Sequence, residues 1–470
     1  MFPSKSRGHT QTGRRPSTTI DLILGAPGPD LLPTRLIQAS TQLALSDDST
    51  WAGQKSDDEI IPTEALLYGP MEGDVTVREA LADLLSRESR LTSSSSFATV
   101  DPSHIMLTSG ASTTLALLLS TFTQAKGITK RVFTSNATYF CAFGIIRDAG
   151  YTFPADAEAT GQTADVEGIS EDAEGIDVDA LEERLSQLDS EYLSGAADIS
   201  QDRKRFRYAL YLVPTFSNPT GTVLSAARRE KLVKLAAKHD ILVICDDVYE
   251  YLYDPSVGGL PPLRLVAVDR AVSEGKNVIS NCTFSKLLAP GTRLGWIECH
   301  PQLITQLLKN GALFSGGGFA HLSSRLVLPL LLPSALPYLQ KDLPALTDIK
   351  VGHSALEHHI DQIRRAYGRR RAALFEAIRE NLLPLGFNLS LGEPLGGYFV
   401  WLELPNDISE KNFVRECAKV EVIVGPGSNF VVSRDEGGKA TIRLCWAWHK
   451  EDRLKEGVQR IGKIVHSLQR

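Results

Sequence analysis

The sequence lacks a long apolar run and a strong excess of charge of either sign. No apolar stretch approaches the ~20 residues that a membrane-spanning helix needs, and the best candidate, residues 326–333, is broken by prolines. The 50 basic and 56 acidic residues give a net charge of −6, so no global field attracts nucleic acid or a membrane surface. The sequence therefore predicts no membrane span and no nucleic-acid partner.

Closely spaced cysteines are also missing. The six cysteines lie far apart, at positions 141, 245, 282, 299, 417 and 445, with no C-x-x-C pair. This spacing suits reduced thiols better than a disulfide framework or a zinc site, so we expect a cytoplasmic protein. Three histidines, His353, His358 and His359, are close in sequence and could be considered as metal ligands. Their spacing does not put all three on one face of a helix, so no metal is expected there.

The first twenty residues contain four basic residues and no acid. A transit peptide has a similar charge balance, but this segment has prolines and no apolar face. We expect residues 1–20 to be a disordered tail rather than a targeting signal.

Short apolar runs alternate with helix-like stretches from about residue 105 to residue 300. The runs at 208–214, 241–247 and 277–284 are nearly uninterrupted by polar residues. This alternation predicts an α/β fold with a mostly parallel sheet covered by helices on both faces. Ligands of such sheets bind beyond the carboxyl ends of the strands. The polar region 154–206 is interpreted as a surface excursion with one helix.

The character of the chain changes after about residue 340. A long helical pattern (353–381) precedes an apolar strand (396–405), a second helix (411–420) and a last strand (441–446). This order of helices and strands predicts a smaller α+β domain.

Two short motifs follow predicted strands. The stretch SGAST (109–113) stands between a strand and a helix, where backbone N–H groups bind phosphate well, although a tight turn gives the same sequence. The stretch FSNPTG (216–221) has ordinary turn residues, and it also could direct the Asn218 amide into a cleft.

Charged residues follow two further strands. Asp246 ends an apolar strand, where it either caps a helix or meets a cation, because a buried carboxylate without a partner is costly. The stretch TFSKLLAPGTRLGW (283–296) places Lys286 and Arg293 on one loop beside Thr283. Lysine can bond covalently to an aldehyde, and arginine forks onto phosphate oxygens.

Together these groups match the needs of pyridoxal 5′-phosphate. That cofactor requires a lysine for its aldehyde, an acid for its ring nitrogen and several donors for its phosphate. The chain supplies all of them near the ends of predicted strands, so this cofactor is expected.

At this point the chain resembles a family, the fold-type I pyridoxal-phosphate enzymes of the class I and II aminotransferases. It is most similar to the branch that holds 2-aminoadipate and aromatic aminotransferases. The resemblance runs from LGAPGPDLLP to TIRLCW and covers nearly the whole chain. The motifs that carry it, in order, are ALLYGPMEGDVTVREAL, LTSGAS, ATYF, NPTG, DDVYE, TFSKLLAPGTRLGW, GGYFVW and VGPGSNF.

The resemblance implies a role for each matching residue. The catalytic residues would be Lys286, which bonds the cofactor aldehyde, Asp246, which pairs with the ring nitrogen, and Tyr249. The phosphate would be held by Gly110, Ala111, Ser112, Thr283 and Arg293, the ring by Tyr139, and the phenolic oxygen by Tyr249 and Asn218. Substrate would be bound by Gly25, Asn218 and Arg443, the last on its α-carboxylate.

The resemblance also implies a homodimer with shared active sites, in which Tyr68 reaches the phosphate of the neighbouring subunit. It implies a small discontinuous domain (21–60 and 340–470) and a large cofactor-binding domain (61–339). Three positions depart from the usual pattern: NATYF lacks a proline before Thr-Tyr, Ser217 stands before NPTG, and Thr283 replaces a serine.

We therefore expect a transaminase that moves an amino group between an α-amino acid and a 2-oxo acid by a ping-pong mechanism. Alternatives are another reaction of the same cofactor (C–S lyase, decarboxylase or synthase) and a cofactor-binding regulator. A regulator needs roughly 70 residues for its DNA-binding module, and LGAPGPD begins at residue 24.

The substrate side chain is left open between aromatic, branched-chain and aminoadipate-like classes. Two tryptophans in CWAW (445–448) either enclose an apolar substrate near Arg443 or pack in the core.

Overall fold

A computed structural model describes residues 18–46, 50–52, 62–92, 98–191, 203–344, 346–433 and 439–468 of the chain. Most of the predicted tail, residues 1–17, lies outside these ranges. The statements that follow concern the described residues.

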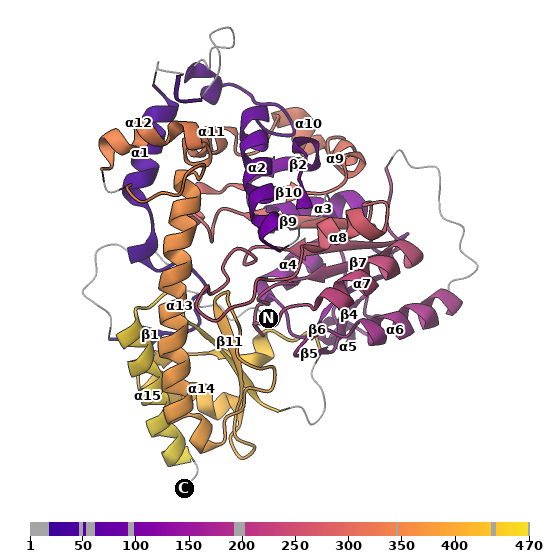
Figure 1. The fold of residues 1–470 in the computed structure, drawn as a ribbon. Coiled ribbons are helices and arrows are strands. Elements are labelled where there is room, and N and C mark those ends of the chain that lie inside the picture. The colour runs from indigo at the N-terminus through magenta and orange to yellow at the C-terminus, as the bar shows by residue number, and fades with distance from the viewer. Residues whose placement is uncertain are drawn as a thin grey trace.

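A seven-stranded sheet forms the centre of the larger part of the molecule (Figure 1). Strand β10 is antiparallel to both of its neighbours, and all other neighbouring strands run parallel. The prediction of a mostly parallel α/β sheet is confirmed. The strand order is β2 (Ile105–Thr108), β10 (Gly295–Glu298), β9 (Val278–Thr283), β8 (Ile241–Asp246), β7 (Tyr208–Leu212), β3 (Arg131–Ser135) and β4 (Val166–Ile169).

Alternate residues of strand β7 point into two different apolar clusters. Tyr208, Leu210 and Leu212 join one cluster, whereas Ala209 and Tyr211 join the other. Because successive side chains of a strand point to opposite faces, the sheet is covered on both sides. One face is covered by α6 (Val178–Glu191), α7 (Ala226–His239) and α8 (Leu265–Val272), and the other by α3 (Ala111–Phe122) and α4 (Phe140–Asp148).

The interpretation of residues 154–206 as a surface excursion is wrong in part. Strand β4 joins the edge of the central sheet and pairs with β3, and a small hairpin of β5 (Glu171–Asp172) and β6 (Gly175–Ile176) follows it. The region also contains two helices, α5 (Pro154–Thr160) and α6. Strand β4 is short and half-buried at an edge, so it lacks the apolar run that marks the inner strands.

The C-terminal part is built on a three-stranded antiparallel sheet with the order β11 (Phe399–Glu403), β14 (Thr441–Cys445) and β13 (Gly425–Pro426). The start of the described chain joins this part, because β1 (Ile20–Asp21) pairs in parallel with β12 (Val422–Ile423). The predicted domain boundaries near residues 60 and 340 stay a prediction.

Helix α13 (Ala355–Asn381) runs along one side of the molecule (Figure 1). It begins at a capping box in which Ser354 and Glu357 satisfy each other's backbone N–H groups. It packs against α11 (His321–Leu331) and α15 (Glu451–Leu468). The remaining helices are α1 (Thr34–Ala44), α2 (Val75–Thr92), α9 (Pro301–Leu307), α10 (Gly311–Gly316), α12 (Leu336–Asp342) and α14 (Glu410–Lys419).

Within the described ranges, no helix is by itself long and apolar enough to cross a membrane; α11 and residues 333–342 pass that test only as a pair bent by 73°.

Candidate active site

A cavity of about 540 Å³ lies beyond the carboxyl ends of β7, β8 and β9 and is closed by β11, β14 and the N-terminal segment. It brings together most of the residues predicted from the sequence. The predicted residues that line it are Gly25, Ala111, Ser112, Tyr139, Asn218, Asp246, Tyr249, Thr283, Lys286, Arg293 and Arg443.

One end of the cavity is suited to an anion. Helix α3 starts there without a side-chain cap, and its N-cap Gly110 has φ 101°, which favours glycine. A Cβ at Gly110 would lie 3.0 Å from Nη2 of Arg293, so a side chain would fill this space. Backbone N–H groups, the guanidinium of Arg293 and the hydroxyls of Ser112 and Thr283 lie at this end. This group could hold a phosphate and is called the phosphate cradle below.

Asp246, at the end of β8, has one carboxylate oxygen in use and one free. Its Oδ2 accepts a 2.5 Å hydrogen bond from the Tyr211 hydroxyl, whereas its buried Oδ1 has no partner among the described residues. Burial raises the pKa of Asp246 to about 6, although the Tyr211 hydrogen bond and the charge of Lys286 act to lower it. At pH 7 the group is mostly ionised and fits a protonated ring nitrogen.

Lys286 follows β9 and points across the cavity. Its Nζ donates a 2.6 Å hydrogen bond to the Gly25 carbonyl oxygen. Burial lowers the pKa of Lys286 to about 8, against the opposing charges of Cys445 and Asp246. An amine with this pKa is partly neutral near pH 7, as a nucleophile toward an aldehyde must be. Gly25 is required at this contact, because a Cβ there would lie 2.6 Å from Cζ of Phe399.

Arg443, on β14, is buried opposite Asp246 and Lys286. Its Nη1 donates a 2.7 Å hydrogen bond to Oδ1 of Asn218, and its Nη2 donates to the carbonyl oxygen of Ile23. Its Cζ lies 4.0 Å from the centre of the Phe399 ring, which favours a cation. Burial lowers the pKa of Arg443. The guanidinium can present both donors to a carboxylate by exchanging these two partners.

Two tyrosines complete the cavity wall. Tyr139 precedes α4, and burial raises its pKa, so its ring stays neutral at ordinary pH. Tyr249 is buried with its ring centre 5.2 Å from that of Tyr398. Both tyrosines line the cavity that also contains the phosphate cradle and Arg443.

Two predicted residues, Gly110 and Tyr68, are not among those that line this cavity. Gly110 adjoins the lining residue Ala111 and lies beside Arg293, whereas Tyr68 lies elsewhere on the chain. The Tyr68 side chain is 89% exposed in the single chain. Two apolar neighbours, Leu66 and Leu67, are also exposed.

Sequence reasoning missed Tyr211, which donates to Asp246, and several residues that line the cavity. Tyr211 was hidden inside an apolar strand, and only its position near the strand end gave a signal. The missed residues that line the cavity are Asp21, Ile23, Leu24, Phe140, Cys141, Val213, Val248, Ser285, Pro290 and Phe399. Of the two interpretations of CWAW, core packing is confirmed for Trp446, which is fully buried with its ring centre 6.1 Å from that of Phe375.

Comparisons with known proteins agree with this geometry. The family model for aminotransferase class I and II matches residues 45–461. The chain is 30% identical to the uncharacterized protein YER152C of Saccharomyces cerevisiae, over 95% of this chain and 97% of that one. It is 29% identical to aromatic-amino-acid aminotransferase 1 of Thermococcus litoralis, over 96% of this chain and 88% of the relative.

A solved structure has a similar fold along nearly the whole chain. The kynurenine aminotransferase of Pyrococcus horikoshii superposes with a TM-score of 0.71 at 28% identity, covering 96% of this chain and 92% of that chain. The Pyrococcus enzyme was crystallised in complex with PMP, with KYN as substrate and KYA as product.

The fold and the cavity define a fold-type I pyridoxal-phosphate enzyme. This cofactor needs an acid beside its ring nitrogen, an amine for its aldehyde and donors for its phosphate. Among the described residues, the unpartnered Oδ1 of Asp246, the amine of Lys286 and the phosphate cradle match these three needs. The chain belongs to the class I and II aminotransferases, and it is a transaminase that uses pyridoxal 5′-phosphate. The predicted branch is also confirmed, since its relatives include aromatic and 2-aminoadipate aminotransferases.

We expect the apoprotein to bind pyridoxal phosphate faster as the pH rises, because only neutral Lys286 attacks the aldehyde. The midpoint of this rise in rate should lie at a pH of about 8, the pKa of Lys286. Stopped-flow absorbance over pH 6–10 measures this rate. Asp246→Asn removes a charge that raises the pKa of Lys286, so its midpoint should lie lower. A wild-type midpoint near the ordinary lysine value of about 10.4 would contradict the assignment.

Proposed function

We propose that Lys286, Asp246 and Arg443 carry the transamination, with Lys286 as the covalent and proton-transferring group. The observation that supports this most strongly is the convergence of one free carboxylate oxygen and one partly neutral amine in a single cavity. A phosphate cradle at one end and a guanidinium at the other complete the arrangement.

Pyridoxal phosphate, when bound, supplies an aldehyde that takes up the amino group and a ring that accepts electron density from the substrate Cα. Asp246 keeps the ring nitrogen protonated, because its ionised carboxylate would otherwise have an unpaired buried oxygen. With a substrate bound, the Lys286 Nζ would accept the proton from Cα as a general base and would donate it, as a general acid, to the carbon that was the cofactor's aldehyde carbon. Water would release the 2-oxo acid and leave the amino group on the cofactor, and a second 2-oxo acid would take that group up, which gives ping-pong kinetics.

The remaining roles concern binding and orientation. Arg443 holds the substrate α-carboxylate, and Asn218, its present hydrogen-bond partner, turns its amide toward the phenolic oxygen of the cofactor. Tyr249 would bind that same oxygen, and Tyr139 would stack on the cofactor ring. The phosphate is held by Gly110, Ala111, Ser112, Thr283 and Arg293, and Gly25 lies at the substrate end.

Apolar amino donors fit the cavity best. The lining residues include Ile23, Leu24, Phe140 and Phe399 beside the site for the α-carboxylate. The cations that line it are Lys286, Arg293 and Arg443, and each has a role toward the cofactor or the α-carboxylate. A second substrate carboxylate would therefore be buried without a partner, which is costly. We infer a preference for aromatic or large aliphatic donors over 2-aminoadipate.

We also infer a homodimer with shared sites. Leu66, Leu67 and Tyr68 expose 69%, 65% and 89% of their side chains, an unusual run of exposed large residues. A second copy of the chain would cover them and receive the Tyr68 hydroxyl at its phosphate. The domain division at about residues 60 and 340 belongs to the same proposal.

A cytoplasmic location is also part of the proposal. All six cysteines are free, as expected for a reducing compartment.

Lys286→Ala should abolish the yellow colour of the bound cofactor and lower turnover by more than ~10³-fold, because no other amine replaces the nucleophile. Absorbance and single-turnover assays with an amino donor measure both effects. Lys238→Ala, an exposed lysine paired with Glu182, is the control and should behave as wild type. Rapid turnover by Lys286→Ala would refute the assignment.

Phenylalanine should react with a kcat/KM at least ~10-fold above that of 2-aminoadipate, because no described lining residue offers a free cation to a side-chain carboxylate. Half-reaction kinetics with a panel of donors measure this ratio. Arg443→Lys should weaken all donors alike, since all share the α-carboxylate. A higher kcat/KM for 2-aminoadipate than for phenylalanine would overturn the inferred substrate class. An unchanged KM in Arg443→Lys would overturn the role of Arg443.

Tyr68→Phe should weaken cofactor binding by about tenfold through loss of one phosphate hydrogen bond. Mixed dimers of Tyr68→Phe and Lys286→Ala subunits test whether the tyrosine acts across the interface. If it does, each mixed dimer keeps one intact site with wild-type affinity for pyridoxal phosphate. If Tyr68 serves its own subunit, titration of the mixed dimers will find no wild-type site.

A further inference from the structure

The β5–β6 hairpin lies beside the turn that carries Asn218. The hairpin spans residues 171–176 and follows the edge strand β4. The turn, residues 217–222, is closed by backbone hydrogen bonds from Ser217 to Thr222 (2.9 Å) and from Gly221 to Ser217 (2.7 Å). A hydrogen bond between Glu171 of the hairpin and Thr220 of the turn makes the two segments neighbours in space, although they lie far apart in the chain.

Glu171 makes the contact between hairpin and turn. Its Oε1 accepts a 2.8 Å hydrogen bond from the Thr220 hydroxyl and another from the Thr222 hydroxyl. The two hydroxyls lie 3.0 Å apart, and both threonines are buried. One carboxylate oxygen therefore ties together two residues that flank Gly221.

The opposite side of the turn is closed by the C-terminal part. Gly221 has φ 75°, and a Cβ there would lie 2.3 Å from Cγ of Pro394 and 2.8 Å from the carbonyl oxygen of Phe399. The turn is thus held between Glu171 on one side and residues 394–399 on the other. Asn218, at its start, has little freedom to move while both contacts persist.

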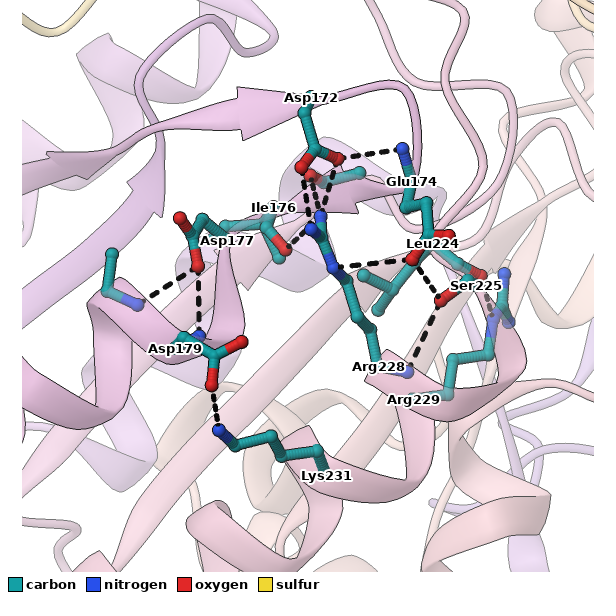
Figure 2. Close-up of polar contacts among 12 residues, drawn as sticks. Asp172, Glu174, Ile176, Asp177, Asp179, Leu224, Ser225, Arg228, Arg229 and Lys231 are labelled. Atoms are coloured by element: carbon teal, nitrogen blue, oxygen red, sulfur yellow. Dashed lines mark hydrogen bonds and ion pairs between the residues drawn. The ribbon is translucent and has the colours of Figure 1, made fainter.

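The hairpin itself is firmly anchored to the start of α7, as Figure 2 shows. Arg228 donates two hydrogen bonds to the Asp172 carboxylate, of 2.7 and 2.6 Å, and a third to the Gly175 carbonyl oxygen. The backbone N–H of Ser225 donates to the Glu174 carbonyl oxygen at 3.1 Å. A bidentate arginine contact fixes orientation as well as distance.

The same helix start is tied to the strand that leads into the turn. Arg229 is fully buried, and it donates to the carbonyl oxygens of Leu224 (2.8 Å) and Pro214 (3.0 Å) and to the Thr215 hydroxyl (2.8 Å). Residues 214–229 and the hairpin therefore form one rigid unit.

Burying the carboxyl group of Glu171 costs free energy, because one of its oxygens has no hydrogen-bond partner among the described residues. A contact with only a structural role would not require this cost. The Oε2 of Glu171 is buried without a partner among the described residues, and burial raises the pKa of its carboxyl to about 7. No cation donates a hydrogen bond to it among these residues, since Arg228 is engaged with Asp172 and with hairpin carbonyls. A buried polar contact of this kind contributes conformational specificity rather than stability.

We propose that Glu171 is a positioning residue that fixes the turn of residues 217–222 and thereby aims the Asn218 amide at cofactor and substrate. The inference rests on the role of Asn218 in the proposed function. It extends the active-site machinery to the hairpin, which touches neither the cofactor site nor Arg443.

Hydrogen exchange of the apoprotein tests the positioning directly. Glu171→Ala should speed exchange of the amides of residues 217–224 at least about tenfold, because both threonine hydroxyls lose their acceptor. Glu171→Gln keeps a carbonyl oxygen for the two hydroxyls and should exchange within about twofold of wild type. Unchanged exchange in Glu171→Ala would overturn the proposal. Thr222→Val removes one of the two hydroxyls that bind Glu171 and should also speed exchange of these amides, which tests the proposal if Glu171→Ala does not fold.

Steady-state kinetics of the loaded enzyme test the consequence. Glu171→Ala should raise KM for the amino donor about tenfold and shift the pH midpoint of the cofactor absorbance, and Glu171→Gln should restore both. Glu167→Ala is the matched control, because Glu167 lies four residues earlier, pairs with Arg184 and should leave KM unchanged. Equal losses in Glu171→Ala and Glu171→Gln, or an equal loss in the control, would overturn positioning.

Asn218→Ala separates this inference from the proposed function. If Asn218→Ala leaves KM and cofactor absorbance unchanged, the role of Asn218 fails whatever Glu171 does. If Asn218→Ala weakens both and Glu171→Ala changes neither exchange nor KM, the positioning role of Glu171 alone fails.

Discussion

The chemistry of this site depends on the buried carboxylate of Asp246, of which only one oxygen accepts a hydrogen bond from the described residues. Asp246 receives one hydrogen bond from Tyr211, and its other oxygen has no donor among the described residues. Because a buried unpaired oxygen is costly, the site favours a ligand that brings a proton to that point. Burial in the same cavity also lowers the pKa of Lys286. One low-dielectric cavity therefore shifts the pKa of both Asp246 and Lys286 toward neutral pH.

Arg443 is constrained in a related way. Without a substrate, its two terminal nitrogens are occupied by Asn218 and by the backbone of Ile23, and the Phe399 ring packs against its guanidinium. These partners satisfy the two terminal nitrogens, whereas the buried Nε has no partner among the described residues. In the proposed function, a substrate carboxylate would therefore exchange with these hydrogen bonds rather than add new ones, which suits reversible binding.

Much of the fold and of the candidate site could be predicted from the sequence, because the functional residues follow strongly apolar strands. Lys286 and Asp246 each come at the end of a buried strand, where position along the chain determines position in space. Strand β4 escaped prediction because an edge strand lacks a continuous apolar run. Tyr211 and Glu171 escaped because their partners lie 35 and 51 residues away, and the contacts form only when the sheet is complete.

The pairing of β1 with β12 joins Ile20 to Val422 and thereby places Leu24 and Gly25 on the wall of the cavity. A ribosome that synthesises this chain must finish nearly all of it before that wall can be set. The large sheet can assemble early, while the first described residues wait for a partner strand some 400 positions downstream. Catalytic competence is consequently one of the last properties that the growing polypeptide acquires, because a copy that stops before Val422 has no partner strand for the segment that leads to Gly25.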